Sequence, residues 1–182
     1  MGLVLIVLLL GGGGYAIMLY NSLVRLRNLK EEAWSGIDVQ LKRRHDLIPA
    51  IVSTVEGYSE HEKETLAELT TLRTQAQQQT SVADIGETER NISKDIKQIF
   101  ALAEAYPDLK ANESFLELQT TLTAVEDDIQ FARRYYNGTV RDYKTKMQMF
   151  PSNIIAGMAS FEDADFFELE FATERKNPEL DL

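Results

Sequence analysis

Residues 115–147 read FLELQTTLTAVEDDIQFARRYYNGTVRDYKTKM, and this stretch decides the fold. Its apolar residues recur at separations of three and four, which places them on one face of a helix. They are Phe115, Leu118, Leu122, Val125, Ile129, Ala132, Tyr136, Val140, Tyr143 and Met147. A seam of this length is typical of a coiled coil or a helical bundle. We therefore expect one long helix that ends at Phe150-Pro151.

The same helical period extends upstream of this seam. Between residues 23 and 72 the apolar positions form a stripe, namely Leu23, Leu26, Ala33, Ile37, Leu41, Ile48, Ile51, Val55, Leu66, Leu69 and Leu72. Pro49 removes one backbone donor and crowds the carbonyl of His45, which predicts a kinked helix, or two helices end to end, over about residues 18–78. A further helix begins near Ser81 or Asp84 and ends before Pro107, and Asn112 is a favourable N-cap for the seam helix.

Alternating strand patterns are missing from the sequence, so the predicted fold is all-α. We expect an N-terminal transmembrane helix followed by an antiparallel long-helix (three- to four-helix) bundle. The predicted segments are a transmembrane helix at 1–20, a helical bundle at 21–150 and an acidic-aromatic C-terminal tail at 151–182.

The N-terminal segment predicts the membrane anchor. Residues 2–20 contain no charge, and residues 3–20 as a helix span about 27 Å, close to the thickness of a hydrocarbon core. A basic n-region, which a cleaved signal peptide needs, does not precede it, so we expect the segment to be retained. Arg25, Arg27 and Lys30 follow it, which predicts a single pass through the inner (cytoplasmic) membrane. The N-terminus then lies outside and the C-terminal domain in the cytoplasm.

Composition and motifs limit the function. A formal net charge of −10 argues against nucleic acid as a partner, and the sequence has no cysteine for a thiolate zinc site or a nucleophile. His45 and His61 lie in neither an H-E-x-x-H nor a Glu-x-x-His motif, and no phosphate-binding or dinucleotide-binding pattern occurs. We therefore expect a protein without catalytic activity, cofactor or metal.

Two features suggest contacts between protomers. Gly12 and Ala16 form a small-xxx-small pair in the apolar segment, which is typical of closely packed membrane helices. The alternative is an apolar stretch that only spans the membrane. Phe166 and Phe167 lie among acids in the tail, where they can dock on their own bundle or on a neighbouring protomer.

A charged segment forms a predicted recognition face. Between residues 37 and 49 it contains Asp38, Lys42, Arg43, Arg44 and Asp46, with Arg43 and Arg44 expected to reach outward. Arg133 and Arg134 flank the seam and are expected to pair with Asp38 or Asp46 across the bundle. The alternative is a solvated helix face with ordinary i,i+4 pairs, each contributing about 0.2–0.5 kcal/mol, and the residue types alone favour it.

Many short stretches together resemble the LemA family. In order they are YNSLV at 20–24, RN at 27–28, AWS at 33–35, IDVQLKRR at 37–44, DLIP at 46–49, GY at 57–58, HE at 61–62, YPDLKAN at 106–112, Phe115, LQ at 118–119, ARRYYN at 132–137, FPSN at 150–153 and FFE at 166–168. The sequence departs from the family where residues 158–161 replace a Phe-Gly-Phe-like run. The resemblance implies a membrane-anchored bundle of long helices with a small external N-terminus, and it implies no reaction.

The sequence therefore predicts a membrane-anchored, self-associating scaffold or interaction protein. Its partners would be the lipid bilayer and other copies of the chain. The alternative is a regulatory adaptor of a membrane protease or of an envelope-stress signalling complex, with residues 42–46 as the contact face.

Overall fold

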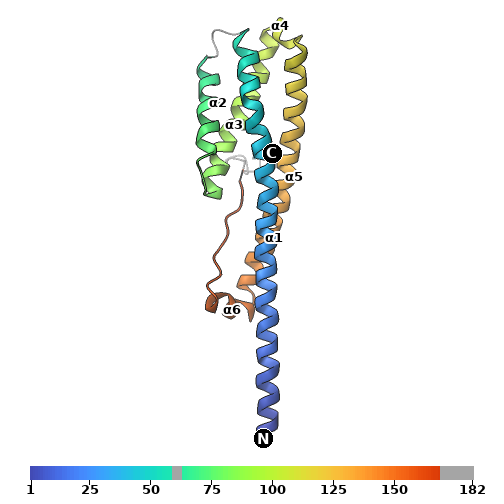
Figure 1. Cartoon of the computed structure of the whole chain (residues 1–182), viewed down its shortest axis with the longest axis vertical. Helices are drawn as coiled ribbons and strands as arrows, with labels where there is room; N and C mark the ends of the chain where they lie inside the picture. The colour runs from blue at the N-terminus through green and yellow to red at the C-terminus, as the bar shows by residue number, and fades with distance from the viewer. Residues whose placement is uncertain (59–62, 169–182) are drawn as a thin grey trace, which may run out of the picture. The chain divides into compact units, whose positions relative to one another are not determined.

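The computed structural model describes residues 1–58 and 63–168, and all of its regular structure is helical within those ranges. Its elements are α1 (Gly2–Glu56), α2 (Lys63–Ala76), α3 (Val82–Leu102), the 3₁₀ turn η1 (Ala103–Ala105), α4 (Pro107–Lys110), α5 (Glu113–Gln148) and α6 (Ser152–Met158) (Figure 1). The all-α prediction, with a long apolar helix first and packed helices after it, is confirmed. His61, Glu62 and Phe171 lie outside the described residues.

The chain divides into two compact units. The first unit comprises Met1–Asp38 and Phe131–Asp165, and the second comprises Val39–Gln130 and the chain from Phe166 onward. Helices α1 and α5 each contribute residues to both units. The predicted boundaries at residues 20 and 150 separate a membrane helix, a bundle and a tail, whereas the two units are separated by compactness. The predicted boundaries therefore stay predictions.

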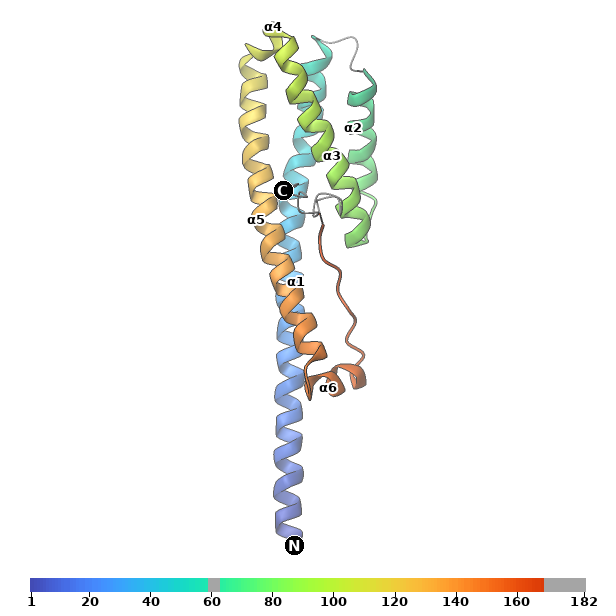
Figure 2. The same ribbon diagram turned by 180° about the vertical axis from the view of Figure 1, so that it is seen from behind.

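In the first unit, the N-terminal part of α1 packs against the C-terminal part of α5. The two helices lie side by side in both views (Figures 1 and 2). Their shared interior contains the buried residues Leu23, Ala33, Ile37, Tyr136, Val140 and Tyr143. Trp34 and Tyr136 meet edge to face, with ring centroids 5.3 Å apart. The seam predicted on α5 is therefore buried in this unit as expected.

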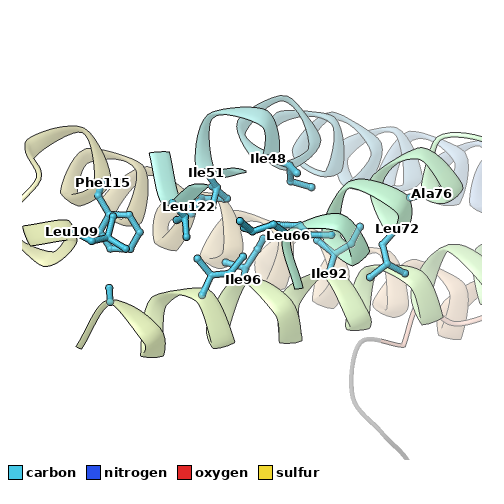
Figure 3. Close-up of a cluster of buried hydrophobic side chains, with 14 residues drawn as sticks. Ile48, Ile51, Leu66, Leu72, Ala76, Ile92, Ile96, Leu109, Phe115 and Leu122 are labelled. Carbon is cyan, nitrogen blue, oxygen red and sulfur yellow. The ribbon is translucent and has the colours of Figure 1, made fainter. Parts of the chain in front are cut away.

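In the second unit, α2 and α3 lie side by side and pack with the end of α1 and the start of α5. One hydrophobic cluster joins all four helices (Figure 3). It includes Ile48 and Ile51 from α1, Leu66, Leu69 and Leu72 from α2, Ile92, Ile96 and Ile99 from α3, and Phe115 and Leu122 from α5. These residues occupy the positions that the helical period assigned to the interior.

Helix α1 continues through Pro49, and the chain leaves the helix after Glu56. Of the two alternatives for residues 18–78, the structure has two helices, α1 and α2, but the break comes after Glu56 and not at Pro49, and both helices contribute to one hydrophobic cluster. Pro49 frees the carbonyl of His45 four residues earlier, since it has no backbone N–H to donate. Arg73 of α2 supplies the missing donor, with its Nε 2.8 Å from that oxygen. A tertiary hydrogen bond thus replaces the lost helical one.

Asn112 caps α5 as predicted. Its Oδ1 accepts a hydrogen bond from the backbone N–H of Phe115 at 3.0 Å, which satisfies one unpaired donor of the first turn. Its Nδ2 also donates to the hydroxyl of Tyr58 at 2.9 Å. Ser81 occupies the N-cap position of α3 without a side-chain capping bond.

Candidate functional site

The most distinctive polar arrangement is a buried ion cluster in the second unit. It joins Arg44 of α1 to Glu89 of α3 and Glu126 of α5, helices that are far apart in sequence. The Arg44 guanidinium is 1% exposed and the Glu89 carboxylate is fully buried. Arg44 Nη2 donates to Glu89 Oε2, and Nη1 donates to Glu126 Oε2 at 2.8 Å and to Ser93 Oγ at 2.6 Å.

His45 completes this cluster from the next position of α1. Its Nε2 lies 2.6 Å from Glu89 Oε1, so both oxygens of the Glu89 carboxylate have partners. Burial by itself raises the pKa of Glu89. The charge of Arg44 and the hydrogen bond from His45 more than offset this effect, and the pKa of Glu89 lies below its ordinary value. Glu89 is therefore held ionised inside the helical bundle.

A second buried carboxylate, on the same helix, has the opposite environment. Asp95 is 3% exposed, and its Oδ2 has no hydrogen-bond partner. Burial raises the pKa of Asp95, the nearby Glu68 raises it further, and Lys94 only partly opposes them. The contrast shows that the arginine, and not the helix, stabilises the charge on Glu89.

A cavity of about 200 Å³ adjoins the ion cluster within the second unit. Its polar lining residues are Arg44, Ser93, Lys97, Thr123, Glu126 and Asp127, and its apolar ones are Ile96, Phe100 and Leu122. Of the polar ones, Arg44, Ser93 and Glu126 are bonded to one another within the ion cluster, which links α1, α3 and α5. Within the described ranges, no group of three or more acidic or histidine side chains is placed to hold a metal ion.

The residues of the predicted recognition face are divided by the structure. Lys42, Arg43 and Asp46 are exposed in the second unit, whereas Arg44 is in its interior. Arg43 pairs at the surface with Asp128, with its Nη1 3.3 Å from the carboxylate. The expectation that Arg44 reaches outward is therefore wrong, because Glu89 and Glu126 draw it inward. A recognition role for the exposed side chains stays a prediction.

The other predicted charged residues belong to the first unit. Asp38 and Arg134 are exposed, and Arg133 is half-buried. They contribute nothing to the ion cluster of Arg44, whose partners all come from the second unit.

The predicted protomer-contact residues also differ in how exposed they are. A side chain added at Gly12 would meet nothing within 4 Å, and Ala16 is half-buried. Phe166 is 40% exposed, whereas Phe167 is fully buried and lies against Gly86 of α3. Phe167 thus docks on its own chain, which is one of the two alternatives that the sequence left open.

Sequence reasoning missed the acidic half of the ion cluster. Glu89 occupies a core position of α3, four residues after Ile85 and three before Ile92. An ionised acid at such an interior position requires a buried cation as its partner. The position of Glu89 in the helical period was therefore the feature from which the ion cluster could have been predicted. Glu126 is less conspicuous, because it is followed by two further acids on the exposed side of α5.

The apolar part of α1 is the second notable surface. Helix α1 is long and apolar enough to cross a membrane, by length and composition. Every side chain from residue 3 to residue 10 is more than half exposed, so this part of the helix belongs to neither hydrophobic interior.

Comparison with known proteins identifies relatives of most of this sequence. The model of the LemA family matches residues 33–182. Protein LemA of Metamycoplasma hominis is 28% identical over 152 residues, which cover 81% of this chain and 68% of that protein. Magnetosome protein MamQ 2 and magnetosome protein MamQ 1 of Paramagnetospirillum magneticum are each 20% identical over 178 residues, 84% of this chain and 65% of theirs. The chain thus spans about two thirds of the length of these relatives.

Proposed function

This chain belongs to the LemA family, as the resemblance predicted, and from that premise we propose that it is a membrane-anchored scaffold or interaction protein that self-associates. The observation that carries this proposal is the apolar part of α1, in which every side chain of residues 3–10 is more than half exposed in the part of the chain that the structure describes. Removal of this much apolar surface from water requires a lipid bilayer or another protein.

The charges that flank this part of α1 favour one membrane orientation. Arg25, Arg27 and Lys30 follow the apolar run, and residues 2–20 contain no charged side chain. Under the positive-inside rule we propose a single pass through the inner membrane, with the N-terminus outside and the bundle in the cytoplasm.

Self-association is proposed through the small residues of the same helix. Side chains added at positions 11–14, which go around the helix, would meet nothing within 4 Å, so the face of α1 with Gly12 and Ala16 has room for a second helix. Small residues let membrane helices approach closely, and Gly12 with Ala16 has the required spacing. Both terminal nitrogens of the Arg44 guanidinium are paired with side chains of its own chain, which suits a structural role better than a catalytic one.

Oxidative crosslinking of the full chain in membranes tests this proposal. The sequence has no cysteine, so Ala16→Cys introduces a single reactive thiol. We expect a disulfide-linked dimer, and we expect Gly12→Leu in the same background to reduce it strongly by blocking close approach. Leu10→Ile is the matched control, since residue 10 lies about 200° around the helix from residue 12 and should leave the dimer unchanged. Recovery of monomer alone would refute self-association.

A regulatory adaptor of a membrane protease or an envelope-stress signalling complex is the second candidate. The observation that favours it is the exposure of Lys42, Arg43 and Asp46 in the second unit. If this surface binds a partner, Arg43→Glu should abolish co-purification of that partner while the helix content is retained. Arg141→Glu is the matched reversal of an exposed charge in the first unit. Equal loss of the co-purified partner in Arg43→Glu and Arg141→Glu would count against a specific contact at Arg43.

A further inference from the structure

The segment that follows α5 lacks charge although the chain as a whole is rich in it. Residues 147–161 read MQMFPSNIIAGMASF, between Lys146 and Glu162, in a chain that is 26% charged. This segment contains α6 and the turns on either side of it (Figure 1). An uncharged stretch of this length in water is normally part of a hydrophobic interior.

Only one side of this segment is packed. Ser152 and Ala156 of α6 are buried in the first unit, as the i,i+4 spacing requires. The other side presents large apolar side chains to the surroundings: Phe150 and Met158 are each 80% exposed, and Ile154 is 51% exposed. The segment is thus apolar on the side that no part of the first unit covers.

The position of this apolar side along α1 indicates what covers it. Phe161, three residues after α6, packs edge to face on Tyr20, with ring centroids 5.7 Å apart. Tyr20 is the last residue before Asn21 and Ser22, the first polar pair of α1, and the first charged residue follows at Arg25. The ring of Phe161 also lies 5.8 Å from the guanidinium carbon of Arg27. The segment is therefore attached to α1 at the level where its apolar part ends and its basic part begins.

The first unit has both basic and acidic side chains near this level, and Glu162 and Asp163 directly follow Phe161. Arg25 and Arg27 of α1 and Lys144 and Lys146 of α5 belong to the same unit. Lys144 pairs with Asp163 at 2.9 Å, which neutralises one of the acids that follow the uncharged segment. Basic side chains beside an exposed apolar surface suit anionic headgroups above a hydrocarbon layer.

We propose that residues 147–161 lie in the membrane–water interface of the bilayer that α1 crosses, with Phe150, Ile154 and Met158 immersed among the lipid chains. This inference rests on the proposed membrane anchoring of α1. A second copy of the chain is a less suitable occupant, because the same level along α1 is where lipid headgroups begin. The segment would act as a second, shallow contact that fixes the tilt and rotation of the first unit relative to the bilayer.

Fluorescence quenching by lipid in the full chain tests this position. Single cysteines replace Met158, Leu9 and Ser35 in turn, each carrying the same environment-sensitive fluorophore. The proteins are reconstituted in vesicles of equal parts phosphatidylcholine and phosphatidylglycerol, with or without brominated acyl chains. Leu9→Cys marks the apolar part of α1, and Ser35→Cys marks an exposed site about 22 Å beyond Tyr20 along the helix.

We expect brominated lipid to quench the Leu9→Cys label most and the Met158→Cys label to a smaller extent. The fluorescence of the Ser35→Cys label should stay unchanged. Phe150→Cys should behave like Met158→Cys, and circular dichroism verifies that each variant keeps its helix content. Quenching at Leu9 without quenching at Met158 would overturn this inference and leave the anchoring intact. The absence of quenching at Leu9 would overturn the anchoring as well. Disulfide crosslinking of Met158→Cys between copies, without quenching by lipid, would identify a protein contact in place of the bilayer.

Discussion

Gly86 of α3 lies directly against the backbone of Glu168. A Cβ at position 86 would be 2.9 Å from the Glu168 carbonyl oxygen and 3.6 Å from Cδ2 of Phe167. Only glycine lets the chain after residue 165 approach α3 this closely, and this approach buries Phe167 completely.

Replacement of Gly86 by alanine should therefore destabilise the second unit. The added methyl group meets backbone, which cannot rotate away, so we expect a loss of about 1–3 kcal/mol despite the higher helix propensity of alanine. The measurement is thermal unfolding of the full chain in detergent, with proteolysis to detect release of the segment around Phe167. Gly138→Ala in α5 is the matched control. Its nearest neighbour would be 3.9 Å away, and it should gain about 0.5–1 kcal/mol. Equal gains of stability in Gly86→Ala and Gly138→Ala would contradict the close approach of the Glu168 backbone to α3.

Two adjacent arginines should differ strongly in their effect on stability. Arg44→Ala leaves Glu89 buried without its cation, and we expect a loss of about 3–5 kcal/mol. Arg43→Ala removes an exposed pair with Asp128 and an exposed hydrogen bond to Gln40, and it should cost at most about 1 kcal/mol. Chemical unfolding of the two variants, followed by circular dichroism, provides the comparison. A similar small loss for both would show that Arg44 is solvated.

Glu89 should make the second unit sensitive to acid. Its pKa is lower in the folded chain than the ordinary value of 4.5, so its contribution is present above that value. This contribution is lost as the pH falls through the folded pKa, since protonation removes the attraction to Arg44. The melting temperature measured between about pH 3 and 7 should fall towards the acid end, and Glu89→Gln should lose much of this dependence.

Asp95 provides the control of opposite sign for this titration. Its pKa is raised in the folded chain, so ionisation destabilises the folded chain as the pH rises through that pKa. Asp95→Asn should therefore raise the melting temperature near neutral pH and have little effect in acid. An acid profile that is unchanged by Glu89→Gln would contradict the assignment to Glu89.

Tyr136 should define the alkaline limit of the first unit. Burial, reinforced by the nearby charge of Asp165, raises the pKa of Tyr136 to about 12. A tyrosine with a raised pKa contributes stability that is present below its unfolded pKa of about 10 and is lost as the pH rises through 12. Ultraviolet titration should show a late ionisation near pH 12 that disappears in Tyr136→Phe, while Tyr143, whose pKa burial also raises, still ionises above the ordinary tyrosine value.

Tyr136→Phe should also lower the free energy of unfolding by about 1 kcal/mol at neutral pH, because the Tyr136 hydroxyl donates to the Asp165 carbonyl at 3.0 Å. Tyr135→Phe is the control, since Tyr135 is exposed and should affect neither the late ionisation nor the stability. Loss of the late ionisation in Tyr135→Phe would contradict the assignment.

The period of apolar residues was sufficient to predict the helices and most of the interior. The seam of α5 is buried at Leu122, Val125, Ile129 and Tyr136 because a helix rotates those positions onto one face. The N-cap of α5 at Asn112 was equally local, since it depends on one side chain and the first turn.

Features that depend on distant segments could not be predicted in this way. Pro49 is a helix breaker by its local chemistry, and only the approach of Arg73 from α2 supplies the replacement hydrogen bond. Arg44 and Arg43 are neighbours of the same type in the sequence. Arg44 is buried because Glu89 and Glu126 lie on the two helices that cover it, which no pattern within α1 reveals.

The partners of Arg44 are translated later than Arg44 itself, so the ion cluster can be completed only late in the synthesis of the protein. Arg44 is translated first, Glu89 follows, and Glu126 comes 82 residues after Arg44. At about 5–20 residues per second, a ribosome needs about 4–16 s to cover this interval. For the later part of that time only Glu89 of the two acidic partners has been translated, so the complete ion cluster forms only after Glu126 of α5 has followed.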